Sequence, residues 1–151
     1  MNPLWNTLTS ADVLKRFTQK EAADLNAVAG TADGLTQIVL ERIQNIRGRI
    51  KAGGRQLGPD GTLPDSLRDL AIDLCVWDWV TSPSGNSKVQ TDVRREKARE
   101  ARDTLKLLAQ GELPVELPDA GELDSVASGV NAIQTVAKRP QEAAFKRTRG
   151  L

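Results

Sequence analysis

Residues 63–80 read LPDSLRDLAIDLCVWDWV, and this stretch decides the fold. Apolar side chains occupy nearly every side of the helix that it predicts, interrupted by Asp73 and Asp78. A helix that is apolar all round is buried all round. We therefore expect it at the centre of a small helical bundle, with Pro64 in its first turn. Each aspartate needs a cationic or hydrogen-bonding partner if it is buried, and cations of the charged helix farther along the chain are candidates.

An amphipathic helix is predicted just upstream of this central helix. It is expected to start near Thr31 or Asp33 and to end at Gly53 and Gly54, since glycine commonly follows the last turn of a helix. Apolar residues recur in it at intervals of four, four, three and four, which places them in one stripe over about five turns. The stripe consists of Leu35, Val39, Ile43, Ile46 and Ile50.

The N-terminal part predicts two short helices or one kinked helix. Thr9 or Ser10 can cap the first of them. Thr18 and Glu21 have the spacing of a capping box, in which each residue bonds the backbone of the other. Gly30 is expected to end the second helix.

Residues 88–110 predict a strongly charged helix whose narrow inner stripe is Val93, Ala101, Leu105 and Leu108. Its outer face is either solvated or, in a ring-shaped oligomer, the contact between subunits. We assign Arg95, Arg99 and Trp79 to that contact. Trp77 and Trp79 lie two residues apart and point to different sides of the central helix; core packing is favoured for both, and one can instead face a neighbouring subunit.

Residues 53–63 form a glycine-rich loop that opens with GGRQLGPDG. It lacks the Gly-Lys-Ser/Thr ending of a phosphate-binding loop, and no strand precedes it. Two interpretations remain: a mobile connector between helices, or a loop beside a passing polyanion or partner. The cations that would serve the second, without base-reading geometry, are Arg47, Arg49, Lys51 and Arg55.

The composition changes after Gly111 and predicts two parts, a helical domain over residues 1–111 and an extended tail over residues 112–151. The tail is acidic and rich in proline and glycine at first, with a short strand expected around Pro114–Leu117, and is basic at its end. Such a segment cannot bury enough apolar surface to fold alone and should order on a partner. The residues assigned to that docking are Lys138, Arg139, Phe145, Lys146, Arg147 and Arg149.

Several functional classes are not expected. The chain has no histidine and one cysteine, so a Ser-His-Asp triad, a histidine-containing zinc site and an internal disulfide are excluded, and a reducing compartment is the natural home of the protein. Asp65, Asp69 and Asp73 share a helix face, but no second set of ligands completes a metal site. We expect no enzyme activity, cofactor, signal peptide or membrane span.

The order of four segments resembles the head-tail connector (head-completion or adaptor) proteins of tailed bacteriophages, in particular their Mu-like group. These segments are LTSADVLKRFTQKEAADL (8–25), IRGRI (46–50), LPDSLRDLAIDLCVWDWV (63–80) and ARDTLKLLAQGELPVELP (101–118). The matching positions are mostly packing positions. They include Pro64, Leu67, Ala71, Ile72 and Leu74 in the third segment, and Ala101, Leu105, Leu108, Ala109 and Gly111 in the fourth.

The resemblance implies an all-α subunit of a ring, often twelve-fold, that binds beneath the portal at the neck of the virion after assembly in the host cytoplasm. The ring would extend the channel for double-stranded DNA and offer an attachment surface to a tail terminator or stopper protein. The loop 53–63 would face the channel and the tail would dock on the portal. Two alternatives stay open: a small nucleic-acid-binding regulator using residues 42–55 and 138–149, and another neck or tail ring protein such as a tail terminator.

Overall fold

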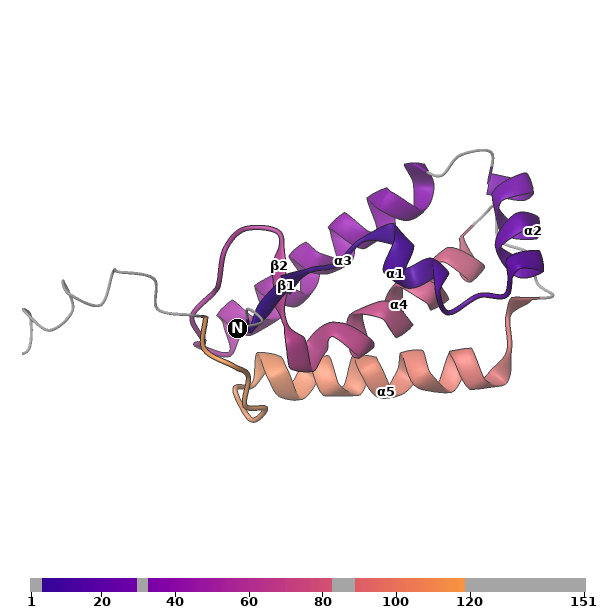
Figure 1. The fold of residues 1–151 in the computed structure, drawn as a ribbon. Helices are drawn as coiled ribbons and strands as arrows, with labels where there is room; N and C mark the ends of the chain where they lie inside the picture. Colours follow the sequence, from indigo (N-terminus) through magenta and orange to yellow (C-terminus); the bar gives the residue numbers. More distant parts are fainter. Residues whose placement is uncertain (1–3, 30–32, 83–88, 119–151) are drawn as a thin grey trace, which may run out of the picture. The chain divides into compact units, whose positions relative to one another are not determined.

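A computed structural model describes residues 4–29, 33–82 and 89–118 of the chain, and these residues are mostly helical. Two short strands pair as an antiparallel ribbon beside five α-helices (Figure 1). The elements in chain order are β1 (Trp5–Thr7), α1 (Ser10–Leu14), α2 (Gln19–Ala29), α3 (Asp33–Ala52), β2 (Thr62–Pro64), the 3₁₀ turn η1 (Asp65–Leu67), α4 (Arg68–Thr81) and α5 (Asp92–Ala109). The prediction of a small helical bundle with a long interhelical loop is confirmed.

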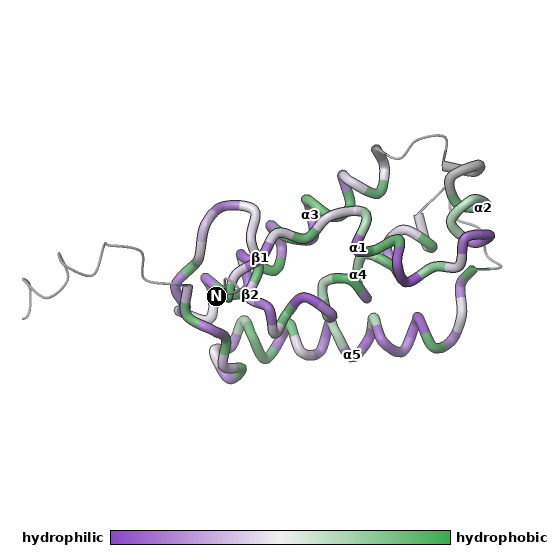
Figure 2. The backbone as a smooth tube through the Cα atoms, in the orientation of Figure 1, coloured by the Kyte–Doolittle hydropathy of each residue, from purple (hydrophilic) through white to green (hydrophobic). Residues whose placement is uncertain are grey.

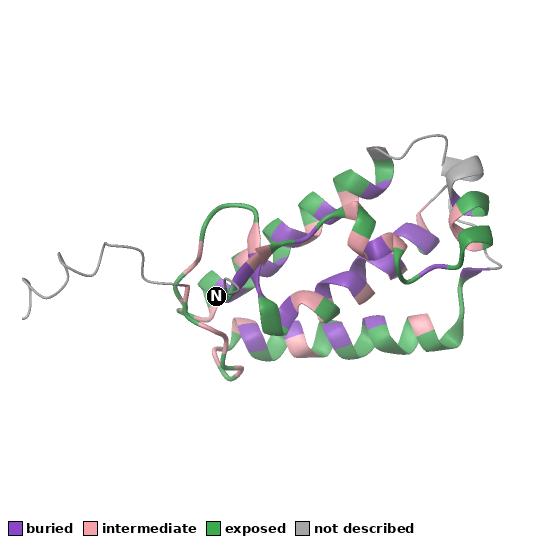
Figure 3. Ribbon diagram, viewed as in Figure 1, coloured by how far each residue is buried: buried purple, intermediate pink, exposed green. Residues whose placement is uncertain are grey.

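Helix α4 lies between α3 and α5 and also contacts α1 (Figure 1). Half of its residues are buried, on several of its sides (Figure 3). The sequence therefore located the centre of the bundle correctly. Its buried residues are Ala71, Ile72, Leu74, Cys75, Val76, Trp79 and Val80.

The start of α4 differs from the prediction. Pro64 does not open the helix but ends β2, where it lies opposite Trp5 of β1. Its backbone is extended, at φ −56° and ψ 141°, a conformation that the proline ring allows at a strand edge because the missing N–H is not needed there. The turn η1 then brings the chain into α4 at Arg68.

All five positions of the predicted α3 stripe are buried, so this prediction is confirmed. Figure 2 shows apolar and polar residues alternating along α3 and α5, as expected for helices with one buried face. The prediction of two short N-terminal helices is also confirmed. The capping box is formed as expected: the Thr18 backbone N–H donates to Glu21 Oε2 at 2.8 Å, and the Glu21 N–H donates to Thr18 Oγ1 at 3.3 Å.

The predicted inner stripe of α5 was wrong at one position. Val93 is 66% exposed, and Ala98 is fully buried in its place. The stripe of Ala98, Ala101, Leu105 and Leu108 keeps intervals of three and four residues, whereas Val93 lies one residue out of that phase. The bulk of valine suggested an inward position, but the phase of the helix decides which residue faces the core.

Asp73 and Asp78 of α4 have different surroundings. Asp78 pairs with Arg42 of α3, whose Nε donates to the Asp78 carboxylate at 2.7 Å. The suggested partner on the charged helix was therefore wrong for Asp78, because the facing cation comes from α3. Asp73 is half-buried and lines a cavity beside Arg16 and Lys97.

The C-terminal ends of α3 and α5 approach each other closely at two glycines. A Cβ on Gly53 would lie 2.3 Å from the carbonyl oxygen of Leu108, and Gly111 has φ 76° with its own Cβ position 3.0 Å from the carbonyl oxygen of Gly53. Only residues without a side chain allow this contact. The glycines therefore set how closely the two helices pack, as well as ending them.

We predict that Gly53→Ala destabilises the protein by about 2 kcal/mol, because the new methyl group forces the two helix ends apart. Gly48→Ala is the matched control, since Gly48 lies within α3 with open space around its Cβ position. It should raise stability by roughly 0.5–1 kcal/mol, as alanine does in a helix interior. Urea unfolding followed by circular dichroism measures both. Equal stability of the two variants would contradict the close contact.

Helix α1 begins with a second capping interaction, centred on Asp12. The Thr9 hydroxyl and backbone N–H donate to Asp12 Oδ2 at 2.8 and 3.1 Å, and Arg68 lies 3.0 Å from the same oxygen. Burial raises the pKa of Asp12, but hydrogen bonds from Thr9 and Lys15 and the charge of Arg68 outweigh it and lower this pKa to about 2.

This low pKa predicts a pH-dependent contribution to stability. Because the pKa of Asp12 lies below its unfolded value of 3.8, the contribution is complete above about pH 5 and is lost as pH falls toward the folded pKa. Asp12→Asn should therefore be less stable than the wild type at neutral pH, with a difference that shrinks toward pH 2. Asp24→Asn, an exposed change on α2, is the control. A constant difference between Asp12→Asn and the wild type from pH 7 to 2 would contradict the assignment.

Candidate functional site

The glycine-rich loop between α3 and β2 is organised by Arg47, which extends from α3. Its guanidinium donates to the carbonyl oxygens of Pro59 and Thr62 at 2.8 Å and of Gly58 at 3.0 Å. It also pairs with Asp60 at 3.4 Å, and only 11% of the Arg47 side chain is exposed. One arginine thus donates to three backbone carbonyls, of Gly58 and Pro59 in the loop and of Thr62 at the start of β2.

The indole of Trp5 closes the other side of this loop. Trp5 is 4% exposed, and the guanidinium carbon of Arg47 lies 5.9 Å from its ring centroid. A Cβ on Gly58 would lie 2.6 Å from the indole, so the loop backbone rests directly against the ring. The sequence analysis assigned no role to Trp5, because an isolated tryptophan near the N-terminus gives no sign of which loop it covers.

The four cations assigned to a DNA-facing loop therefore occupy different surroundings. Arg47 is held inside the loop and leaves little charge for a polyanion. Arg49 and Lys51 are exposed on the last turns of α3. Arg55 is half-buried, and its guanidinium donates to the carbonyl oxygen of Gly111 at 3.2 Å. The interpretation of the loop as a mobile connector is not supported either, because its carbonyls and the indole hold it in place.

We predict that Arg47→Met lowers stability by about 2 kcal/mol, because three backbone carbonyls lose a charged donor and the largely buried guanidinium contacts are lost. Arg49→Met, two residues away on the same helix and exposed, should change it by less than about 0.5 kcal/mol. Thermal unfolding measures the difference, and limited proteolysis within residues 53–61 reports whether the loop opens. The role of Arg47 would be disproved by a loop that stays equally protected in both variants.

Residues 112–118, called here the docked segment, lie against the helical domain and belong to the same compact unit. The indole Nε1 of Trp5 donates to the carbonyl oxygen of Glu116 at 3.0 Å, and the Ser66 N–H donates to the Glu116 carboxylate at 3.2 Å. Leu113 and Val115 pack against the core. The strand expected around Pro114–Leu117 is absent from these residues, because side-chain contacts rather than a ladder hold the segment.

The docked segment and the loop meet at the same end of the domain, where α3 and α5 also end (Figure 1). The basic residues assigned to portal docking lie outside the described residues, together with the rest of the tail. Their predicted role stays a prediction. They are Lys138, Arg139, Phe145, Lys146, Arg147 and Arg149.

The residues assigned to a subunit contact separate into two groups. Arg95 and Arg99 are exposed on α5, as a contact requires. Trp79 is 2% exposed, and its ring packs edge-on against Phe17 with centroids 5.3 Å apart. The assignment of Trp79 to a surface contact was wrong, because the all-round burial of α4 includes this residue. Trp77 is the partly exposed tryptophan of the pair.

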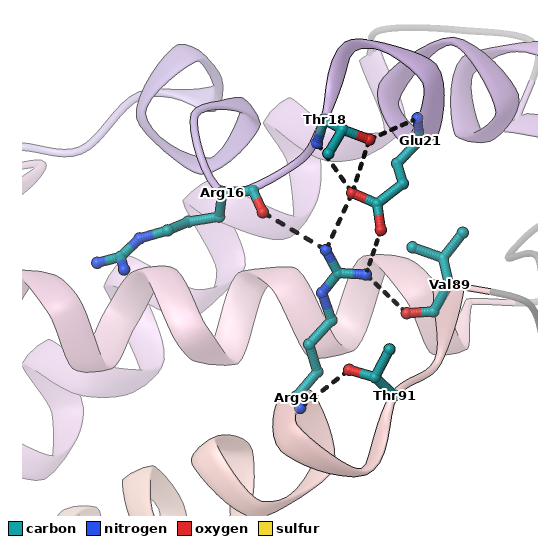
Figure 4. Close-up of polar contacts among 6 residues, drawn as sticks. All are labelled: Arg16, Thr18, Glu21, Val89, Thr91 and Arg94. Carbon is teal, nitrogen blue, oxygen red and sulfur yellow. Dashed lines mark hydrogen bonds and ion pairs between the residues drawn. The ribbon is translucent and has the colours of Figure 1, made fainter.

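Arg94, at the start of α5, joins α5 to α2 and to the turn between α1 and α2 (Figure 4). Its guanidinium donates to both oxygens of Glu21 at 3.1 and 3.3 Å, and to the carbonyl oxygens of Val89 at 2.8 Å and Arg16 at 3.4 Å. It also lies 4.6 Å from the Phe17 ring centroid. The hydrogen bonds from Arg94 and then Thr18 lower the pKa of Glu21 despite its partial burial. This cluster fixes α2 onto the bundle.

A cavity of about 240 Å³ lies beside this cluster. Its polar lining includes Arg16, Glu21, Asp73 and Lys97, but Glu21 is already bound by Arg94 and Arg16 by Asp69 at 2.6 Å. Thr91 supplies a hydroxyl to the same lining, and its oxygen accepts from the Arg94 N–H at 3.3 Å as the cap of α5.

Cys75 is buried within α4, and burial, followed by the charge of Asp78, raises the pKa of its thiol to about 12. A thiol in this state is unreactive at neutral pH. Within residues 4–29, 33–82 and 89–118, no three histidine, cysteine or carboxylate side chains gather as a metal site. In the same ranges, no helix is both long and apolar enough to span a membrane.

Comparisons with known proteins add no further assignment. No protein-family model matches the chain, and no curated protein or solved structure is similar enough to count as a match. The function is therefore argued from the residues and their geometry.

Proposed function

We propose that this protein is a structural subunit of a head-tail connector ring of a tailed bacteriophage. In this proposal the ring lies beneath the portal at the neck of the virion, extends the channel for double-stranded DNA and offers an attachment surface to a terminator or stopper protein. It acts without cofactor and without chemistry on a substrate. The resemblance of segments 8–25, 46–50, 63–80 and 101–118 to such connectors is its starting point.

The observation that carries the proposal is the shared position of the basic loop and the start of the tail. Arg55 bonds the carbonyl of Gly111, and the docked segment covers Trp5, which in turn covers the loop. A connector needs one end that meets the portal and the DNA channel. The end of the domain where α3 and α5 end carries the basic loop and the start of the tail, which are the two elements assigned to those contacts. Arg49 and Lys51 are exposed there, and such cations suit diffuse attraction to phosphates rather than reading of bases.

The packing of the resembling segments supports the same proposal. The positions that carry the resemblance in residues 63–80, such as Leu67, Ala71 and Leu74, are buried in the bundle, and so are Leu105 and Leu108 of the last segment. The resemblance thus falls on residues that determine the fold, and not on scattered surface positions. This is the pattern expected when a fold, rather than a catalytic site, is shared.

The test is recruitment by the portal protein encoded in the same genome. We predict that the full chain co-purifies with the portal and adds a ring visible by electron microscopy. A chain that ends at Val136, which lacks the basic end of the tail, should bind at least about tenfold more weakly, since it loses several charges and the Phe145 anchor. Undiminished binding by the shortened chain would contradict the role of the tail, and absence of binding by the full chain would contradict the proposal.

The alternative of a nucleic-acid-binding regulator is favoured by the charge of residues 41–55, which is +4. It predicts that the free subunit binds duplex DNA with an affinity that falls steeply with salt. A connector subunit should bind DNA weakly before assembly, since Arg47 is bound within the loop. The terminator alternative is less favoured, because such proteins are typically α/β and the described residues here are mostly helical.

A further inference from the structure

The outer face of α5 carries two rows of opposite charge along the whole helix. Successive members of each row are three or four residues apart, so each row runs along one side of the helix. All eight side chains are exposed. The basic row is Arg95, Arg99, Arg102 and Lys106, and the acidic row is Asp92, Glu96, Glu100 and Asp103.

The two rows lie side by side. Glu96, Glu100 and Asp103 each directly follow a member of the basic row in the sequence, and one residue turns an α-helix by about 100°. The buried stripe of α5, which includes Ala98 and Leu105, faces α4 and the core. The boundary between the rows therefore faces outward.

The side chains of the central charges of this face form no hydrogen bond or ion pair in the described part of the chain, although the charge of Arg99, after the hydrogen bond and charge of Lys106, contributes to lowering the pKa of Asp103. In that part, Asp92 pairs with Arg95 at 3.3 Å and Asp103 with Lys106 at 2.7 Å, at the two ends of the rows. The described residues form no hydrogen bond or ion pair with the side chains of the four charges between them. These four are Glu96, Arg99, Glu100 and Arg102.

This arrangement distinguishes between possible occupants. A polyanion such as DNA would meet the acidic row at the same time as the basic row, and within the two rows the four negative charges offset the four positive ones. A second copy of α5 offers the complementary pattern: its acidic row can face the basic row of the first copy, and the reverse. The charges thus favour self-association over nucleic-acid binding on this face.

The pattern also fixes the direction of the pairing. When two helices run parallel, opposite flanks of their contact faces meet, as the e and g positions do in parallel coiled coils. The basic row of one copy then lies along the acidic row of the other. When the helices run antiparallel, equivalent flanks meet, so that basic would face basic and acidic would face acidic. Rotation about an axis that runs along α5 generates only parallel copies, which is compatible with a ring.

We propose that copies of this chain associate through α5, with neighbouring α5 helices parallel and the basic row of one against the acidic row of the next. This inference rests on the proposed self-assembly of the connector and adds the surface, the charges and the orientation. Exposed ion pairs are individually weak. The contact should therefore be weak in isolated subunits, strengthen when a portal gathers them, and weaken with salt.

Charge reversal in the full-length chain tests the pairing. We expect that Arg99→Glu/Arg102→Glu and Glu96→Arg/Glu100→Arg each weaken self-association in sedimentation velocity at low salt by about tenfold or more. An equimolar mixture of the two variants should regain it, since the reversed rows are again complementary. Lys20→Glu, which reverses an exposed cation of α2, is the control and should associate like the wild type.

Crosslinking tests the orientation. Two variants, Asp92→Cys and Lys106→Cys, each place an exposed thiol at one end of the rows. Because Cys75 is buried, a short bifunctional maleimide reacts with the introduced thiol alone among the described residues. These positions lie about 21 Å apart along the helix. Parallel copies predict that each variant crosslinks to itself, whereas antiparallel copies predict crosslinks in a mixture of the two variants.

The inference is overturned if the wild-type chain does not self-associate, or if the charge-reversed variants associate as the wild type does. It is also overturned if the mixture of these two variants does not recover association, or if crosslinks form only between the Asp92 and Lys106 cysteine variants.

Recruitment by the portal is measured separately. Portal binding without any effect of the α5 reversals would reject the α5 pairing and leave the connector function standing. Absence of portal binding would reject the connector function even if α5 pairs as proposed.

Discussion

The burial of α4 is the constraint on which the rest of the structure depends. A helix with apolar residues on nearly every side cannot be stable against one neighbour, because each uncovered side would leave apolar surface in water. Helices α3 and α5 pack on it and on each other, and α1 contacts it as well. Strand β2 lies in the connection between α3 and α4, and it pairs with β1, which precedes α1. The apolar sides of α4 are thus covered by several elements together.

The helical part of the fold was predictable, because the burial of each helix follows from the spacing of its apolar residues. The α3 stripe, the Thr18–Glu21 capping box and the glycines after α3 each depend on spacing within one short segment. The predictions for Val93 and Pro64 were wrong because the position of each residue depends on contacts with elements elsewhere in the sequence. The phase of α5 excludes Val93 in favour of the smaller Ala98, and Pro64 ends a strand only because Trp5 lies opposite it.

The candidate site was less predictable for the same reason. The sequence showed a basic glycine-rich loop, but it did not show which of the cations would be exposed and which would be bound by the loop backbone. Arg47 looks equivalent to Arg49 in sequence, yet one is bound by loop carbonyls and the other is exposed. Trp5 and Glu116 lie 111 residues apart and meet through a single hydrogen bond. Such contacts follow from the assembled fold and leave no local pattern from which to infer them.

The charges of this chain can therefore be interpreted only once it is known which charged side chains are exposed and which are bound within the fold. From the sequence alone, the charged face of α5 could be either a solvated face or a contact between subunits. Once the buried stripe of α5 is known, its charges separate into two outward rows, and the separation of signs is what a self-complementary surface requires. By the same reasoning, the +4 charge of residues 41–55 overstates their attraction for DNA, because Arg47 and Arg42 are bound within the fold. In the proposed pairing, the charges that folding leaves exposed on α5 complement those of a second copy.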